Sequence, residues 1–246
     1  MEALKKPQLI DKLCGWCGGC GHGIIQRLIC EVIEELGIQD KVIHCCDIGC
    51  CFWAVDGIDT DCISGPHGRV PAVATGVKKV RPENIVFIYA GDGASYTIGM
   101  AETTHLVMRD LPVTMIVVNN GAFGMTGGQM SVGTTLIGQK TASTPKGRKQ
   151  EYNGEPADML AAYSTFDVEF LARGALYNVR EINNTKALIK KGFQNQMEGK
   201  GLSLIEVLSP CPTTWHLSPI EANKRIEEEV TKMFPVKVYK DRGGRK

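Results

Sequence analysis

The apolar positions of this chain change along its length between helical spacing and the continuous runs of buried strands. Residues 24–36 carry apolar side chains at helical spacing, and Gly37 is a suitable helix stop. Residues 84–90 and 113–120 are apolar runs typical of strands buried on both faces. The stretch between these runs predicts a helix over about 97–109. This order of strand, helix and strand predicts an α/β fold, with a mainly parallel sheet flanked by helices.

The rest of the chain continues this alternation on both sides of one long region that has no period. Residues 121–153 are rich in Gly, Thr, Ser and Gln, and a loop of this length inside a compact domain is usually functional. Before this region the pattern adds a strand that begins at Lys41 and a helix at 72–80. After it the pattern adds a helix, a strand, a helix and a strand in turn, at 156–166, near Glu169, at 186–197 and at 202–209.

The last part of the chain carries a clear helix start. Ser218 and Glu221 have the spacing of a capping box, and Pro219 occupies the first helical position. Neither an internal repeat nor a linker interrupts the chain. We therefore predict a single domain over residues 1–246, with a C-terminal tail from about 217 to 246.

Composition and charge exclude several classes of function. The chain has 246 residues, of which 43% are hydrophobic and 22% charged, so that it can bury a sizeable core. A net charge of +1 gives nucleic-acid binding no electrostatic support. No apolar run approaches the roughly 18 residues of a membrane span. The first residues lack the apolar core of a signal peptide, so that the cytoplasm is the expected location and no membrane partner is expected.

The chain contains ten cysteines, three of which, Cys14, Cys17 and Cys20, share the stretch LCGWCGGCGHG. Disulfides are rare in a reducing compartment, where closely spaced cysteines more often bind metal or do redox chemistry. From the thiols alone, zinc, an iron–sulfur cluster and no ligand at all remain open. Cys30 and Cys62 lie in apolar sequence surroundings and are expected to be small buried hydrophobic residues.

Polar residues follow two of the predicted strands at the point where each ends. Gly91-Asp92-Gly93 comes after the first strand, and Asn120 ends the second. The two strand ends of such a unit lie close together at the carboxyl edge of the sheet, where ligands bind. One carboxylate and one amide oxygen suit Mg²⁺, which takes its other ligands from phosphates and water. The alternative, a plain strand-ending turn, is weaker because the Asn-Asn pair accompanies Gly-Asp-Gly.

This pairing resembles the thiamine-diphosphate motif of TPP-dependent enzymes. More narrowly, CGGCGHG, HGRVPAVATGVK, GDG…NN…FGMTGGQ and GQKTASTP are similar to the TPP-binding, beta-type subunit of 2-oxoacid:ferredoxin oxidoreductases. The wording of the loop is closest to the 2-oxoisovalerate and 2-oxoglutarate branches. The similarity extends from about residue 10 to VYKDR near the end, and the motifs occur in the family's order.

The resemblance implies a set of cofactor residues. It implies that Asp92, Asn120 and the backbone carbonyl of Ala122 hold Mg²⁺, and that His67 is a catalytic residue close to the cofactor. His22 is a further candidate neighbour of the cofactor, whereas His44, His105 and His216 are expected to be structural or on the surface. The cofactor-binding residues implied by the resemblance are Gly49, Cys50, His67, Gly68, Gly91, Asp92, Gly93, Ala94, Asn120, Ala122, Gly124, Met125 and Thr126.

The resemblance also implies a [4Fe–4S] cluster held by Cys17, Cys20, Cys50 and Cys211. Gly18 stands where the family usually has a proline, and the ligand spacing is unchanged. The alternative, a structural zinc site, is disfavoured because an oxidative TPP enzyme needs a one-electron acceptor and zinc is not redox-active. The motif leaves Cys14, Cys45, Cys46 and Cys51 without an assigned role.

The activity implied is TPP-dependent oxidative decarboxylation of a 2-oxoacid to acyl-CoA and CO₂, with coenzyme A as co-substrate and electrons passed through the cluster to ferredoxin. The glutamate that such enzymes place against the aminopyrimidine ring is expected from an alpha-type partner, alongside gamma- and delta-type subunits, so that the chain alone should be inactive. The physiological direction and the subunit stoichiometry remain open.

The substrate is predicted from two aromatic residues. If Phe52 and Trp53 line the pocket, they favour an apolar acyl group, with 2-oxoisovalerate first and 2-oxoglutarate next; core packing is the equal alternative. Two other classes of function compete. A non-oxidative TPP lyase or synthase would leave the cysteines idle, and a zinc or iron–sulfur scaffold or electron-transfer module would leave the magnesium motif idle.

Overall fold

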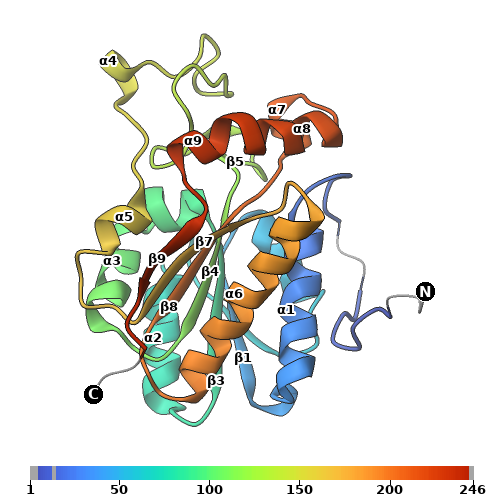
Figure 1. Cartoon of the computed structure of the whole chain (residues 1–246), viewed down its shortest axis with the longest axis vertical. Coiled ribbons are helices and arrows are strands. Elements are labelled where there is room, and N and C mark those ends of the chain that lie inside the picture. The colour runs from blue at the N-terminus through green and yellow to red at the C-terminus, as the bar shows by residue number, and fades with distance from the viewer. Residues whose placement is uncertain (1–4, 13–14, 244–246) are drawn as a thin grey trace.

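A seven-stranded sheet lies between two layers of helices in the computed structural model, which describes residues 5–12 and 15–243 (Figure 1). The strand order is β2-β1-β3-β4-β8-β7-β9, and each neighbouring pair is parallel except β7 and β9. The strands are β1 (Val42–Cys46), β2 (Asp61–Ser64), β3 (Ile85–Gly91), β4 (Thr114–Asn119), β7 (Phe170–Ala175), β8 (Ser203–Leu208) and β9 (Lys237–Asp241). The predicted α/β class with a mainly parallel sheet is confirmed.

Both faces of the sheet are buried, as the continuous apolar runs predict. Helices α1 (His22–Leu36) and α6 (Val179–Met197) cover one face, and α2 (Val70–Val80), α3 (Met100–Arg109) and α5 (Met159–Tyr163) cover the other (Figure 1). Successive residues of a strand point to opposite faces. Within β3, Phe87 and Tyr89 therefore join the core under α1 and α6, whereas Val86, Ile88 and Ala90 join the core on the other face.

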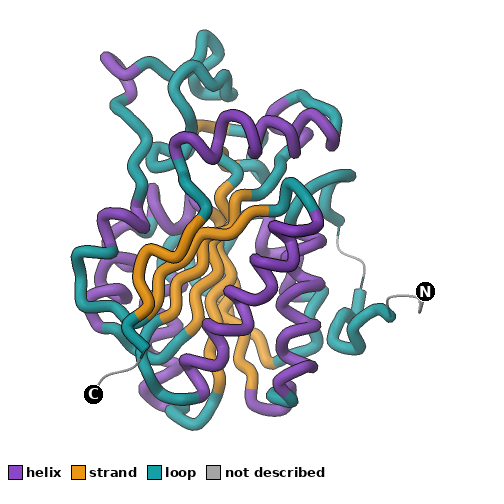
Figure 2. The backbone as a smooth tube through the Cα atoms, viewed as in Figure 1, coloured by secondary structure: helices purple, strands orange, loops and turns teal. Residues whose placement is uncertain are grey.

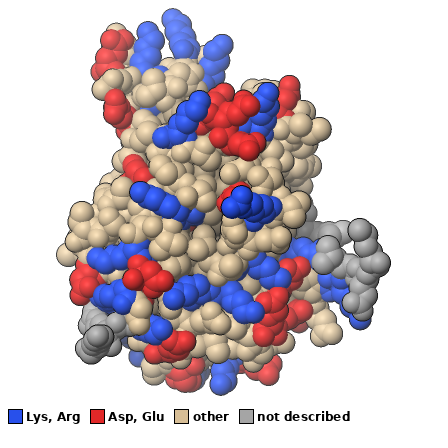
Figure 3. All heavy atoms as spheres, in the orientation of Figure 1, with Lys and Arg blue, Asp and Glu red and all other residues tan. Residues whose placement is uncertain are grey.

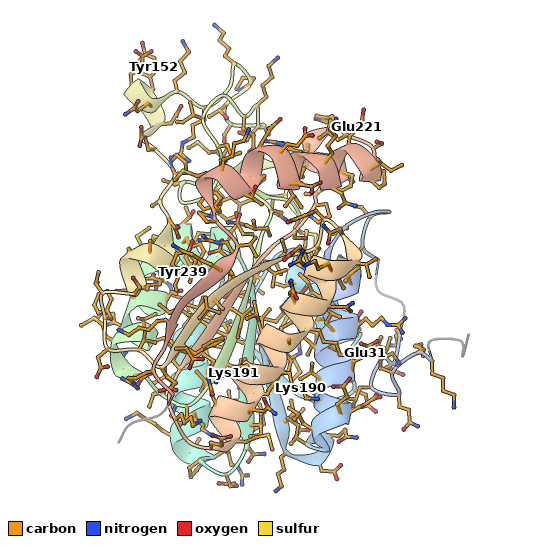
Figure 4. The ribbon with its side chains drawn as sticks, in the orientation of Figure 1. Glu31, Tyr152, Lys190, Lys191, Glu221 and Tyr239 are labelled. Atoms are coloured by element: carbon orange, nitrogen blue, oxygen red, sulfur yellow. The ribbon has the colours of Figure 1, made fainter. Side chains whose placement is uncertain are left out.

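Ion pairs join the two helices of the first layer. Lys186 Nζ lies 2.7 Å from Glu31 Oε2, and Lys190 Nζ lies 2.8 Å from Glu35 Oε2. Figure 4 shows Glu31 on α1 and Lys190 on the neighbouring α6. These groups are partly exposed, so that each pair adds at most about 1 kcal/mol to a contact that rests on apolar packing.

Short elements crowd the carboxyl edge of the sheet (Figures 1 and 2). β1 and β3 each run into a short helical segment, and β4 runs into a hairpin. The elements of this edge are η2 (Cys50–Val55), η3 (Ala94–Ile98), β5 (Ala122–Phe123), β6 (Gln129–Met130), α7 (Pro212–Trp215), α8 (Pro219–Arg225), η4 (Ile226–Val230) and α9 (Thr231–Met233), while η1 (Gln39–Lys41) precedes β1. The predicted capping box of α8 is present, with the Ser218 and Glu221 side chains each bonded to the other residue's backbone.

The long region without a period, residues 121–153, extends beyond this edge as an arm (Figure 2). It contains a short helix, α4 (Gln150–Asn153), and Tyr152 stands exposed at its tip (Figure 4). Lys146 and Lys149 are exposed on the arm, where Figure 3 shows basic side chains. The guanidinium of Arg148 is buried at the base and donates to the carbonyls of Thr135, Asn153 and Gly154. The Arg148 guanidinium thus satisfies three backbone carbonyls that have no helix or strand to pair with.

Three features differ from the sequence-based predictions. Helix α6 begins seven residues earlier than expected, because Asn178 caps it and its first turns are too polar to show a period. The segment expected as a tail contains β9, an antiparallel edge strand on β7. Cys62 is exposed on the edge strand β2, so that its predicted burial is wrong, whereas Cys30 is buried as predicted.

No helix in the described ranges is long and apolar enough to cross a membrane.

His44 in β1 supplies a prediction about stability. Its ring is fully buried and stacks on Phe87, and neither ring nitrogen has a hydrogen-bond partner among the described residues. Burial lowers the pKa of His44 from 6.5 to about 3, so that the unfolded chain binds a proton that the folded chain rejects between these values. Stability is therefore complete above about pH 6.5 and falls as the pH drops through that window.

Replacing His44 with leucine is expected to remove this loss and to raise the free energy of unfolding near pH 4 by about 3 kcal/mol. Urea unfolding at pH 7 and pH 4.5 measures it, with the exposed His105→Gln as the matched control. Equal acid sensitivity of His44→Leu and the native chain would contradict the buried neutral state of His44.

Candidate cofactor site

A cleft opens at the carboxyl ends of β1, β3 and β4. The structure brings to it every cofactor-binding residue implied by the sequence resemblance except Gly68, which lies behind His67. His22, Ile48, Cys51 and Phe123 also line it. The lining residues taken from the sequence are Gly49, Cys50, His67, Gly91, Asp92, Gly93, Ala94, Asn120, Ala122, Gly124, Met125 and Thr126.

Asp92 is the anionic group of the cleft. Its side chain is buried, and Oδ2 accepts hydrogen bonds from the Gly121 backbone N–H and the Thr134 hydroxyl. Among the described residues Asp92 forms no ion pair, so that its charge is balanced by neutral donors alone. Burial raises the pKa of Asp92 from 3.8 to about 6. A buried carboxylate with neutral donors and no cation fits a divalent metal with a preference for oxygen, such as Mg²⁺.

The loop after β6 supplies donors that the sequence did not single out. Thr134 bonds Asp92, and the Thr135 hydroxyl donates to the Gly121 carbonyl at 2.6 Å. The Gln139 amide donates to the same carbonyl at 3.1 Å. The arm therefore folds back onto the turn that follows β4 and fixes it. The signal in the sequence was the group of hydroxyl side chains at Ser131, Thr134 and Thr135.

The two asparagines at the end of β4 have different environments. Asn120 lines the cleft, and its Oδ1 accepts from the Ala122 N–H at 3.2 Å. Asn119 points the other way and donates to Glu206 Oε1 at 2.8 Å. Glu206 is buried, pairs with the buried Arg173 at 2.8 Å and also accepts from the Tyr96 hydroxyl at 3.1 Å. This paired network locks the end of β4 against the first helical turn after β3, which are the two sides of the cleft.

Two glycines at the end of β3 are required for different reasons. A Cβ on Gly91 would meet no atom within 4 Å and would extend into the open space of the cleft. A Cβ on Gly93 would instead overlap the ring of Phe123. The backbone after β3 thus borders the cleft without a side chain at Gly91, which fits the close approach of a diphosphate.

His67 lies at the cleft beside a buried carboxylate. Its Nδ1 is 3.0 Å from Asp47 Oδ1, and its ring lies edge-on to Phe123 with the centroids 5.9 Å apart. The Asp47 side chain is 1% exposed, and the His67 side chain is 31% exposed. Sequence reasoning missed Asp47, although an acidic residue directly after a buried strand was a usable signal.

His22 also lines the cleft, as the sequence suggested. Its ring stacks on Trp16, and its Nδ1 is 2.6 Å from the Tyr89 hydroxyl. Burial lowers the pKa of His22 to about 4, so that the imidazole is neutral at physiological pH. His22 therefore brings a polar but uncharged group to the wall of the cleft.

Three loops bring the predicted cluster cysteines together. The Cys17–Cys20 turn is closed by a backbone hydrogen bond of 3.1 Å, Trp16 Nε1 donates to the Cys50 carbonyl at 2.7 Å, and Gly21 N donates to the Pro210 carbonyl at 3.3 Å. The thiols of Cys20, Cys50 and Cys211 are close enough to influence one another electrostatically. A Cβ on Gly124 would lie 3.2 Å from Cys50 Sγ and 3.8 Å from Cys211 Sγ, so that the thiols border the cleft directly.

The chemistry of this donor set fits a cluster cofactor. Burial, reinforced by the neighbouring thiols, raises the pKa of Cys20 to about 11 and that of Cys50 to about 12. Such thiols stay protonated until a bound metal deprotonates them. Within the described ranges no three His, Cys, Asp or Glu side chains are grouped as ligands of a single metal ion. A cluster of several iron atoms spaces its thiolates more widely than one ion does.

The other cysteines near the cleft are placed differently. Cys46 and Cys51 are buried side by side, and their contact and burial raise the pKa of Cys46 far above its usual range. Cys45 is buried on the other face of β1, and burial raises its pKa to about 12. Buried thiols with a raised pKa, such as those of Cys45 and Cys46, are unreactive. Cys14 lies outside the described residues.

The residues expected to select the substrate do not reach the cleft. Phe52 and Trp53 are 42% and 44% exposed on η2, and the cleft lining does not include them. Ile48 and Met125, 38% and 47% exposed, supply its apolar side chains together with Phe123. The apolar character is thus present, but it comes from other residues than Phe52 and Trp53.

Comparison with known proteins shows the family of this chain. Residues 47–207 match the family model of the thiamine pyrophosphate enzyme C-terminal TPP binding domain. The chain is 38% identical to ketoisovalerate oxidoreductase subunit VorA of Methanothermobacter thermautotrophicus over 92% of this chain and 48% of the relative. It is 31% identical to 2-oxoglutarate synthase subunit KorB of Archaeoglobus fulgidus over 87% of this chain and 75% of the relative. It thus spans about half the length of VorA and three quarters of that of KorB.

A solved structure has a similar fold. The chain superposes with a TM-score of 0.73 and 27% identity on a 2-oxoglutarate:ferredoxin oxidoreductase from Magnetococcus marinus that contains 2-oxoglutarate, coenzyme A and succinyl-CoA. The match covers 87% of this chain and 70% of that one.

Proposed function

We propose a function from the premise that this chain belongs to the thiamine pyrophosphate enzymes, as a C-terminal TPP-binding domain of the kind found in 2-oxoacid:ferredoxin oxidoreductase subunits. The chain acts in the oxidative decarboxylation of a 2-oxoacid. The 2-oxoacid and coenzyme A give acyl-CoA, CO₂ and one proton, and two electrons leave to two ferredoxins. The observation that carries the proposal is the cleft at the strand ends that joins the buried, cation-free Asp92 to the thiol of Cys50.

The donors of the cleft separate into two groups that match two cofactors. Asp92, Asn120 and the carbonyl of Ala122 would hold Mg²⁺, with the diphosphate along Gly91, Gly93 and Gly124. Thiamine diphosphate supplies the electron sink for loss of CO₂, and a [4Fe–4S] cluster supplies one-electron acceptance. The thiols that would hold the cluster are Cys17, Cys20, Cys50 and Cys211.

The chain's own residues orient the reactants and exclude water. Thr134 and the Gly121 amide hold the Asp92 carboxylate, so that the metal binds a pre-positioned ligand. The Asn119–Glu206–Arg173 network holds the end of β4. Ile48 and Phe123 present apolar surface above the polar floor, which lowers the local dielectric and strengthens charge interactions at the site. Cys50 lines the cleft, and Gly124 of the cleft lies against the thiols of Cys50 and Cys211, so that electrons would have a short route out.

Other polypeptides complete the site. The described residues that line the cleft include no Glu, Lys or Arg. A glutamate for the aminopyrimidine and a cation for the substrate carboxylate are therefore proposed to come from an alpha-type partner, within an assembly that includes gamma- and delta-type subunits. The relatives are themselves named as subunits, which supports this assembly.

The proposed substrate is 2-oxoisovalerate, with 2-oxoglutarate second. Ile48, Phe123 and Met125 offer contacts to a branched apolar chain, whereas the second carboxylate of 2-oxoglutarate would lose hydration against them. The higher identity to the ketoisovalerate relative points the same way.

Anaerobic viologen reduction across a panel of 2-oxoacids with coenzyme A tests the function. The complex purified with its partners is expected to prefer 2-oxoisovalerate over 2-oxoglutarate by about 10-fold or more in kcat/KM, as expected for a difference of one or two apolar contacts. The chain purified alone is expected to be inactive. Activity of the single chain would overturn the partner requirement, and a cofactor-loaded complex that oxidises no 2-oxoacid would overturn the function.

A further inference from the structure

We propose that Asp47 is a positioning residue that fixes the tautomer and the direction of His67, so that the unprotonated Nε2 of His67 faces the cofactor cleft. The proposal rests on the proposed function for its reaction, and on the three donors that meet one oxygen of Asp47 for its structure. Asp47 directly follows β1, and His67 lies on the turn before α2, twenty positions later in the chain.

A single oxygen of Asp47 collects three donors. Oδ1 accepts from the Ile48 N–H at 2.7 Å and from the Gly68 N–H at 2.9 Å, and the third neighbour is His67 Nδ1 at 3.0 Å. An ionised carboxylate is purely an acceptor. The nitrogen of His67 that faces it must therefore carry a proton, which leaves Nε2 as the acceptor nitrogen of the neutral ring.

The backbone keeps this arrangement in place. The Asp47 N–H donates to the Tyr89 carbonyl at 3.0 Å, which ties the residue to β3 and so to the Gly91–Asp92 turn. Gly68 has φ of +77°, and a Cβ there would lie 2.7 Å from the Gly99 nitrogen, so that the His67–Gly68 turn packs directly against the helix after β3. Phe123 flanks the ring on the cleft side. The hydrogen bond to Asp47 and the edge-on contact with Phe123 together favour this orientation of the ring.

The burial of Asp47 makes a purely structural role expensive. Its Oδ2 is buried and has no hydrogen-bond partner among the residues that the structure describes. A buried carboxylate oxygen without a hydrogen-bond partner lowers the free energy of unfolding. An Asn or Ser at this position could accept from the same backbone amides with a smaller desolvation penalty. The negative charge is useful only to a neighbour that gains from it, and that neighbour is His67, whose Nδ1 faces Asp47 and whose ring lines the cleft. His67 is thereby able to accept a proton at Nε2 from a bound reactant and to return it.

The tautomer of His67 can be read directly. The full chain labelled with ¹⁵N at histidine is measured by NMR in its complex, and His67→Gln assigns the His67 signals. The expected result is a protonated Nδ1 and an unprotonated Nε2 at neutral pH. A protonated Nε2 would overturn the proposal without any variant of Asp47.

Asp47→Asn then tests the consequence. Asparagine keeps an oxygen for the two backbone amides, so that the fold is retained while the charge is lost. The turnover number of the complex is expected to fall by about 10- to 100-fold, with KM and the affinity for Mg²⁺ with thiamine diphosphate unchanged. Asp56→Asn, on the exposed end of η2, is the matched control and should behave as the native protein. An unchanged turnover number for Asp47→Asn would overturn the proposal.

The two proposals fail in different ways. A complex that is inactive with all 2-oxoacids but has the Nδ1–H tautomer would overturn the proposed function and leave the positioning by Asp47 intact. An active complex with the Nε2–H tautomer would do the reverse.

Discussion

Replacing Asp92 with asparagine is expected to raise the dissociation constant of Mg²⁺ with thiamine diphosphate by about 100-fold or more, a loss of about 3 kcal/mol of binding free energy. Asp92 is the one carboxylate among the described residues that line the cleft, and it has no competing cation. An amide in its place offers the metal a single neutral oxygen, which the Thr134 hydroxyl and the Gly121 amide already use. Isothermal titration of the metal-free protein measures this change.

The same substitution should make the metal-free protein more stable, which separates lost binding from misfolding. Burial raises the pKa of Asp92 from 3.8 to about 6, so that the folded chain holds a proton more tightly than the unfolded chain between these values. The stabilisation from this group is present below about pH 4 and lost as the pH rises through 6. At pH 8 the ionised, buried carboxylate therefore costs up to about 3 kcal/mol that asparagine does not.

The expected signature of Asp92→Asn is a raised melting temperature at pH 8 without ligand, together with the loss of the further stabilisation that ligand binding adds to the native protein. Thr104→Ser, on the far side of α3, keeps its hydrogen bond to the Met100 carbonyl and serves as the control. A metal-free variant less stable than the native protein at pH 8 would contradict the strained state of Asp92.

Local signals predicted the framework of the fold and the floor of the cleft. The buried strands β3 and β4 appear in the sequence as apolar runs, and the residues at their ends need no tertiary information to be brought together, because parallel strands end at one edge. That Asp92 and Asn120 meet at one edge of the sheet could therefore be predicted from the sequence. The N-terminal half of α6 and the edge strand β9 could not, because both are stabilised by contacts with distant elements rather than by their own periodicity.

The supports of the cleft depend on pairings that a single sequence does not contain. Glu206 stands as one charge inside the apolar strand β8, and its partners Arg173 and Asn119 come from two other strands. Thr134 reaches Asp92 through a loop without a period. The substrate residues were misplaced for a related reason: the turn of η2 directs Phe52 and Trp53 outward and leaves the cleft to Ile48, one turn earlier. The direction of a side chain on an irregular segment is set by tertiary packing.

Replacing Cys50 with serine is expected to remove iron from the purified complex and to lower ferredoxin reduction by about 1,000-fold or more, since the cluster is the proposed one-electron outlet. Serine keeps the volume of the side chain and the carbonyl that Trp16 Nε1 bonds, so that the three loops should remain together. Thiolates are the preferred ligands of iron–sulfur clusters, and a hydroxyl is a poor substitute. Iron and sulfide analysis, the visible spectrum and the rate of ferredoxin reduction measure the loss.

The neighbouring cysteine provides the matched comparison. Cys51 differs from Cys50 by one position, but its thiol is 3.1 Å from the Asp47 carbonyl and contacts Cys46, which is not among the expected cluster ligands. Cys51→Ser and the exposed Cys62→Ser are therefore expected to keep full iron content, and Cys50→Ser to keep its affinity for Mg²⁺ with thiamine diphosphate within about threefold. Iron lost from Cys51→Ser but retained in Cys50→Ser would reverse the assignment of the ligand. Zinc in place of iron in the anaerobically purified native complex would overturn the cluster, and with it the oxidative reaction.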